Sequence, residues 1–191
     1  MDLLKKMESE IQKIIFKSQV PEDPIHSQNT REWVLKLKPD ADLALQIAAL
    51  GHDIERSISE RKINRDNYTD YDEFKKVHSQ RSGRILHEIL LLYNIDQTIR
   101  DKVTNLVILH ETGGNSEANI LKDADGISFF DVSLPFYFQR HPERETAFRM
   151  IRGYKRLSKR ARSIVRNISY NNTKLAALFQ KVILNDTPNK R

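Results

Sequence analysis

The chain contains no cysteine, and this absence excludes several classes of protein. Disulfide-stapled folds, zinc sites built from thiolates and cysteine nucleophiles all require a residue that this sequence lacks. No apolar run approaches the ~18 residues of a membrane-spanning helix, and the first residues do not have the pattern of a signal peptide. We therefore expect a protein of the reducing cytoplasm that does not enter a membrane.

Strand-like alternation of apolar and polar residues is also absent over any useful length. Apolar residues instead recur with helical spacing almost throughout, and residues 43–50 are almost wholly apolar, which is typical of a buried helix. The length of 191 residues is that of one ordinary domain. We predict an all-α fold in a single domain spanning residues 1–191, in which a C-terminal helix at about 172–186 packs on the rest.

Positive charge is concentrated in one segment. The chain has a net charge of +6, yet residues 140–166 alone contain ten Lys and Arg against Glu143 and Glu145. Apolar residues between positions 150 and 168 are spaced as one helical stripe, which predicts a single helix with a solvated basic face. A segment of this charge can also bind an anion, either a phosphorylated small molecule or nucleic acid. Only Tyr154 interrupts it with an aromatic ring, which does not favour a base-stacking surface.

Polar side chains follow the apolar helix directly, as His52 and Asp53. Burying such groups without partners is costly, so we expect other polar side chains nearby. His26 lies on the preceding predicted helix, which a short loop connects to the apolar one. Helices joined in this way pack antiparallel, and this arrangement places His26 near His52 and Asp53.

Two further carboxylates, Asp123 and Asp125, lie on a predicted helix over residues 116–130. Asp125 shares a face with apolar residues and should point inward, whereas Asp123 lies on the neighbouring face. Two carboxylates on a hydrophobic helix suggest one metal ligand and one supporting group. Imidazoles and carboxylates together suit a borderline to hard cation such as Mn²⁺, Mg²⁺, Co²⁺, Ni²⁺ or Fe²⁺.

These polar residues occur in a characteristic order along the chain: His26, His52-Asp53, His78, His110-Glu111 and Asp125. The order resembles the HD superfamily of metal-dependent phosphohydrolases over about residues 20–170. The resemblance implies an all-helical, HD-domain-like core and one divalent metal ion with these ligands: His26, His52, Asp53 and Asp125. It thereby favours Asp125 over Asp123 as the fourth ligand.

The resemblance also suggests roles for the residues around these ligands. Asp53 and Glu55 are the predicted catalytic groups, which orient a water molecule or take its proton. His78 and His110 either hold a second metal ion or contact the substrate. Arginine suits bidentate contact with phosphate. The predicted substrate-binding residues are Arg56, Arg65, His78 and His110.

From these residues we expect a phosphatase or phosphodiesterase that acts on a small phosphorylated substrate, with a nucleotide as the expected class. Such an enzyme uses a metal-activated water molecule. Two alternatives remain open: a helical module that binds nucleic acid through residues 140–166, and a non-catalytic sensor that binds metal or nucleotide. The sequence leaves the oligomeric state open.

Overall fold

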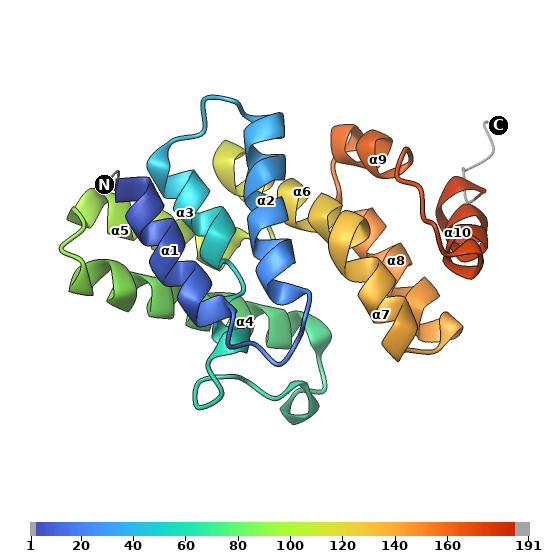
Figure 1. Cartoon of the computed structure of the whole chain (residues 1–191), viewed down its shortest axis with the longest axis horizontal. Coiled ribbons are helices and arrows are strands. Elements are labelled where there is room, and N and C mark those ends of the chain that lie inside the picture. The colour runs from blue at the N-terminus through green and yellow to red at the C-terminus, as the bar shows by residue number, and fades with distance from the viewer. Residues whose placement is uncertain (1–2, 186–191) are drawn as a thin grey trace. The chain divides into compact units, whose positions relative to one another are not determined.

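The computed structural model describes residues 3–185 and is helical in both halves of the chain (Figure 1). These residues contain no strand, so the predicted all-α fold class is confirmed. Contacts between Cα atoms divide the chain into a first unit, residues 1–125, and a second unit, residues 126–191. The single domain expected from the sequence stays a prediction. Residue 186, the expected end of the C-terminal helix, lies outside the described residues.

The first unit is a cluster of helices around α3 (Figure 1). Its helices and 3-10 turns are α1 (Leu3–Ile15), α2 (Asp23–Leu37), α3 (Leu43–Gly51), η1 (Ile54–Ser57), η2 (Arg65–Asn67), α4 (Tyr71–Leu92), α5 (Gln97–Leu109) and α6 (Ser116–Ser128), the last of which extends into the second unit. The apolar helix α3 packs against α1, α2 and α5 and is buried along nearly its whole length, as its composition predicts.

Aspartates begin three of these helices. The side chains of Asp42, Asp70 and Asp96 each accept a hydrogen bond from a backbone N–H of the first turn that follows. Asp23 does not cap α2 in this way: the N-cap is Glu22, and Asp23 accepts a hydrogen bond of 2.6 Å from the Ser18 hydroxyl. Helix α2 therefore begins one residue before Pro24.

The end of α3 approaches α4 very closely at Gly51. A Cβ atom on Gly51 would lie 2.6 Å from the Leu86 side chain, which is itself fully buried. Only glycine leaves room for this contact, and His52 and Asp53 follow it at once. The close approach of α3 and α4 at Gly51 therefore positions His52 and Asp53 beside α4.

The second unit contains short helices and carries the basic segment. Its elements are the π-helical turn η3 (Phe129–Ser133), α7 (Leu134–Arg140), α8 (Glu143–Arg156), α9 (Lys159–Val165), α10 (Thr173–Phe179) and the π-helical turn η4 (Gln180–Leu184). Helix α10 and η4 pack against α8. In the part of the chain that the structure describes, no helix combines the length and the apolar character needed to cross a bilayer.

The single basic helix expected over residues 150–168 is wrong, because the chain turns between α8 and α9. Leu157 is extended, and the Ser158 hydroxyl accepts a hydrogen bond of 3.2 Å from the Ala161 N–H to start a new helix. Arg162 donates to the carbonyl oxygens of Tyr154 and Lys155 at the end of α8. A side chain from the new helix thus satisfies carbonyl groups that the break exposes.

Candidate metal centre

Helices α2 and α3 bring two histidines together, as their short connection predicted. The Nε2 atoms of His26 and His52 are 3.2 Å apart. The Ser27 hydroxyl donates to the carbonyl oxygen of Leu50 and joins the two helices beside this pair. Asp125 reaches the same point from α6, with its Oδ1 atom 3.3 Å from Nε2 of His26 and 3.5 Å from Nε2 of His52. We call His26, His52 and Asp125 the first group.

The spacing within the first group fits a single metal ion. Ligand atoms that lie about 2.1 Å from a shared ion are about 3.0–3.4 Å apart in tetrahedral or octahedral geometry. The three donor atoms of the first group have nearly this spacing. The Oδ2 atom of Asp53 lies 3.7 Å from Nε2 of His52 and pairs with Arg56 at 2.8 Å, and Asp53 does not join the first group. Its predicted role as the fourth ligand stays a prediction. Asp123 belongs to none of the candidate groups that residues 3–185 offer.

A second group lies beside the first and includes Asp53. The other carboxylate oxygen of Asp53, Oδ1, lies 2.8 Å from Nε2 of His78 on α4 and 3.7 Å from Nε2 of His110 at the end of α5. We call Asp53, His78 and His110 the second group, and it too has a spacing at which a metal ion can be held. Asp53 therefore lies between the two groups.

The backbone orients two of these imidazoles. The Nδ1 atom of His52 lies 2.9 Å from the carbonyl oxygen of Ala49, and that of His110 lies 2.7 Å from the carbonyl oxygen of Val107. A carbonyl oxygen only accepts hydrogen bonds, so Nδ1 carries the hydrogen in both rings. Nε2, which faces the cluster, is then the atom left to bind a metal.

Glu55 orients the third imidazole, that of His78. One oxygen of the Glu55 carboxylate lies 2.7 Å from Nδ1 of His78, and the other accepts a hydrogen bond from the backbone N–H of Ile63. Glu55 is 1% exposed, so both oxygens are engaged away from solvent. Its predicted role in proton transfer stays a prediction. The contacts of Glu55 indicate a different role, which is to hold the His78 ring with Nε2 toward Asp53.

Opposite charges stabilise one another inside the cluster. Burial lowers the pKa of both imidazoles, but the neighbouring carboxylates outweigh this and raise the pKa of His52 to about 9 and that of His78 to about 10. Burial likewise raises the pKa of Asp53, but His52 and Arg56 outweigh it and hold that pKa well below its usual range. Without metal, the cluster therefore holds protons at neutral pH that a bound cation would replace.

Of the two arginines predicted to contact phosphate, Arg56 lies at the cluster. Its guanidinium bridges Asp53 and Asp23 at 2.8 Å and 3.0 Å. Arg65 lies on the exposed turn η2, where it donates to the carbonyl oxygen of Tyr68. Its predicted role as a phosphate contact stays a prediction.

Two residues of the site received no role in the sequence interpretation. Glu111 belongs to a third candidate group with His110 and Asp125, and Lys75 forms an ion pair with Glu111. The side chains of Lys75 and Glu111 are only 15% and 10% exposed. The sequence indicated both residues by their spacing from predicted site histidines. Lys75 precedes His78 by three positions on α4, and Glu111 follows His110 directly.

A family model described as "Domain of unknown function (DUF4202)" matches residues 4–178, and the chain therefore belongs to this family. No curated protein matches the chain. No solved structure matches it either.

Proposed function

We propose that this chain is a divalent-metal-dependent phosphohydrolase with a site of the HD type, acting on a small phosphorylated substrate. The observation that carries the proposal is the position of Asp53 between two histidine-containing groups, with Oδ1 2.8 Å from Nε2 of His78 and Oδ2 3.7 Å from Nε2 of His52. Both groups are built from nitrogen and oxygen donors with no sulfur, the set that Mn²⁺, Mg²⁺, Co²⁺, Ni²⁺ or Fe²⁺ accepts.

The residues of the first group, with Asp53, would hold one divalent ion, and those of the second group are candidates for another. A divalent ion in such a site supplies a Lewis acid for a phosphoryl oxygen and lowers the pKa of bound water. Asp53 lies between the groups, where its carboxylate can orient a water molecule and accept its proton. Histidine rings fixed through Nδ1 keep their Nε2 atoms aimed at the cluster.

Two cations are placed to take up the charge of a phosphate. Arg56 pairs with Asp53 and Asp23, and Lys75 pairs with Glu111. Both cations are held beside the candidate ligands by carboxylates, and a phosphate group can replace a carboxylate as their partner. Their presence supports an anionic substrate and leaves phosphomonoesters and phosphodiesters both open.

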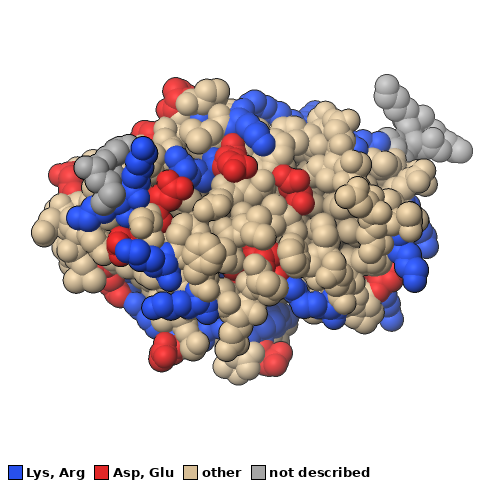
Figure 2. Space-filling view, viewed as in Figure 1, with Lys and Arg blue, Asp and Glu red and all other residues tan. Residues whose placement is uncertain are grey.

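The basic segment gives weaker support to the nucleic-acid alternative. Arg162 binds carbonyl oxygens of α8, and Arg166 donates to the carbonyl oxygens of Ile183 and Leu184. Both arginines therefore serve helix ends within the second unit. Over the first unit, the face drawn in Figure 2 has Lys and Arg side chains interspersed with Asp and Glu. A sensor that binds metal without turnover would use the same site, so only an assay of hydrolysis distinguishes a sensor from an enzyme.

Metal content and hydrolysis test the proposal together. We expect the wild-type protein to bind Mn²⁺ and to hydrolyse ribose 5-phosphate or a simple phosphodiester. The variants His52→Ala and Asp53→Ala should each lower the metal affinity and the rate by more than about 100-fold, since even residues behind the ligands change metal affinity by about 10–100-fold. Metal bound per chain is measured by elemental analysis and calorimetry, and the rate by phosphate or alcohol release.

Helix α4 offers a matched control, because His78 and His87 lie on it nine positions apart. His87 is half-buried and contacts Thr104, away from the candidate groups. His87→Ala should therefore leave metal content and rate unchanged, whereas His78→Ala should reduce both. Full metal content and activity in His52→Ala would overturn the proposal. Metal binding without hydrolysis of any phosphate ester would favour the sensor.

A further inference from the structure

One face of α4 leads outward from the candidate metal centre through aromatic rings. Tyr71, Phe74, Lys75 and His78 are spaced three, one and three positions apart, so they share a face of the helix. The Phe74 ring stacks on the His78 ring with centroids 6.3 Å apart and planes 22° apart. The centroids of Tyr71 and Phe74 are 6.0 Å apart. Since His78 contacts Asp53, Phe74 adjoins the candidate metal centre through His78, and Tyr71 lies one ring further out.

These aromatic side chains are not part of the hydrophobic core. Tyr68, Tyr71 and Phe74 are all half-buried, although the large apolar side chains of the core are almost completely covered. Tyr68 meets Phe74 edge to face, with centroids 5.7 Å apart, and so supports the Phe74 ring from the preceding loop. Half-buried rings beside a polar site are surfaces on which a planar group can stack.

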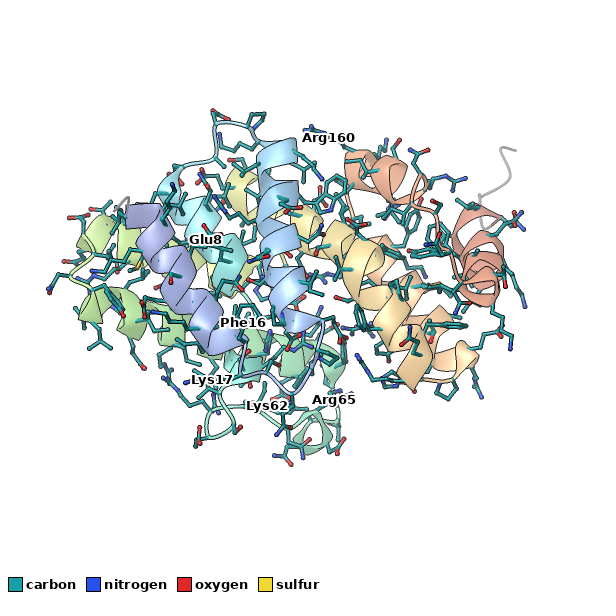
Figure 3. The ribbon with its side chains drawn as sticks, viewed as in Figure 1. Glu8, Phe16, Lys17, Lys62, Arg65 and Arg160 are labelled. Atoms are coloured by element: carbon teal, nitrogen blue, oxygen red, sulfur yellow. The ribbon has the colours of Figure 1, made fainter. Side chains whose placement is uncertain are left out.

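A planar cation already lies over these rings. The Arg65 guanidinium carbon is 5.4 Å from the centroid of Tyr71 and 5.7 Å from that of Phe74. Arg65 reaches them from the exposed turn η2, on the loop before α4 (Figure 3). A side chain held by such a turn can give way to another planar group without disturbing the core. The Arg65 guanidinium thus covers the rings from the loop side, and a base that stacks on them would take its place.

A second cation lies between the rings and the metal centre. Lys75 Nζ is 5.6 Å from the Tyr71 centroid and pairs with Glu111, whose carboxylate lies 3.5 Å from Nε2 of His110. The order along this face is therefore aromatic rings, then a cation, then the histidines. His78 follows Phe74 by four positions, which is about 6 Å along a helix, the scale of one sugar ring.

We propose that Tyr71 and Phe74 form a subsite that stacks the base of a nucleotide whose phosphate lies at the metal centre. This inference rests on the proposed function, which it deepens by naming the substrate class. Stacking recognises a planar ring and tolerates different bases, because every base has a π-face. We therefore expect the site to distinguish nucleotides from sugar phosphates more strongly than purines from pyrimidines.

Binding to the metal-free protein tests the subsite separately from hydrolysis. The probes are AMP, UMP and ribose 5-phosphate, titrated in the presence of EDTA and followed by saturation-transfer difference NMR. Both nucleotides should bind about 5- to 100-fold more tightly than ribose 5-phosphate, the range expected of one stacked base, and their base protons should receive the strongest saturation. Tyr71→Leu and Phe74→Leu should lower nucleotide affinity and leave ribose 5-phosphate unchanged.

Two control variants separate stacking from folding effects. Tyr71→Phe keeps the ring and should retain the preference for nucleotides. Phe148→Leu removes an exposed phenylalanine of the second unit and should change no affinity. Equal affinity of the wild type for AMP, UMP and ribose 5-phosphate would overturn the subsite. A double variant, Tyr71→Leu with Phe74→Leu, that still prefers nucleotides to ribose 5-phosphate would overturn it as well. A base preference in a protein that hydrolyses no phosphate ester would instead refute the proposed function and leave the subsite standing.

Discussion

Two carboxylates separated by one residue, Asp53 and Glu55, have unlike surroundings and therefore unlike roles. The Asp53 side chain is 19% exposed, and its two oxygens contact His78 and Arg56 beside His52, so it lies inside the polar cluster. Glu55 is buried and contacts His78 from the side away from the cluster. At the scale of a residue, then, burial and neighbours decide which of two similar groups acts on the site and which supports it.

The support from Glu55 can be tested with Glu55→Gln. Glutamine keeps the size of the side chain but replaces one acceptor oxygen with an NH₂ group, so either His78 or the Ile63 N–H loses its partner. We expect the free energy of unfolding to fall by about 1–3 kcal/mol and the metal affinity of the second group to fall by about 10–100-fold. Urea denaturation and calorimetry with Mn²⁺ measure the two effects.

Glu88 provides the control for this substitution. It is an exposed glutamate of α4 that pairs with Arg61, and its side chain is 49% exposed. Glu88→Gln should cost less than about 1 kcal/mol and leave metal affinity unchanged. Wild-type metal affinity in Glu55→Gln would show that His78 does not depend on Glu55 for its orientation.

At the scale of elements, the site depends on how closely α3 and α4 approach. His52 and Asp53 come from the end of α3, and His78 comes from α4. The contact of Gly51 with Leu86 sets the separation of these helices beside the site. A change at Gly51 therefore acts on the polar cluster without removing any of its side chains.

Gly51→Ala should be destabilising although alanine favours helices. Its Cβ atom would overlap the buried Leu86 side chain, and overpacking of this kind costs about 1–3 kcal/mol. The loss is measured by urea denaturation. In a Leu86→Ala background the added methyl group has room, so Gly51→Ala should cost clearly less there, as a double-mutant cycle would record. Equal costs in both backgrounds would contradict the packing argument.

At the scale of the whole molecule, the candidate site belongs entirely to the first unit, and the basic segment belongs to the second. Every residue of the three candidate groups lies between positions 26 and 125. The site gathers buried charges of both signs, so the protons it holds affect the stability of the fold. Proton binding is therefore a property that can be measured on the intact, metal-free chain.

Without metal, stability should fall as pH rises above neutrality. The pKa of His52 is raised to about 9 and that of His78 to about 10, against an ordinary value near 6.5. A histidine whose pKa is higher in the folded state stabilises the fold fully at pH values below its unfolded pKa. This stabilisation is lost as the pH rises through its folded pKa. We expect the free energy of unfolding in EDTA to decrease from pH 6.5 to pH 9, as measured by urea denaturation.

A bound cation should flatten this dependence, because it replaces the protons that the histidines hold. The same titration with saturating Mn²⁺ should therefore show a smaller decrease. The metal-free variant that combines His52→Ala with His78→Ala should lose most of the slope, whereas His87→Ala should keep it. A metal-free wild type whose stability does not change over this pH range would show that the cluster holds no extra protons.

Local patterns in the sequence, with the resemblance, predicted most of the helices and every residue of the candidate groups except Glu111. The meeting of His26 with His52 followed from two helices joined by a short loop, and the burial of α3 followed from its composition. The contact of Lys75 with Glu111 was not predicted, because it depends on how α4 is rotated toward the end of α5. The turn at Leu157 was missed because apolar spacing continues across it, and the Ser158 cap is a weak local signal.

The position of the Asp53 carboxylate between the two groups has a thermodynamic consequence for the proposed metal centre. Since this carboxylate lies 2.8 Å from His78 and 3.7 Å from His52, ions at the two groups would not bind independently. By thermodynamic linkage, an ion at the first group changes the affinity of the second group for its ion by a certain factor. An ion at the second group changes the affinity of the first group by the same factor. Loading of the proposed centre would therefore be cooperative, with positive cooperativity if the first ion preorganises Asp53 and negative cooperativity if repulsion between the cations prevails.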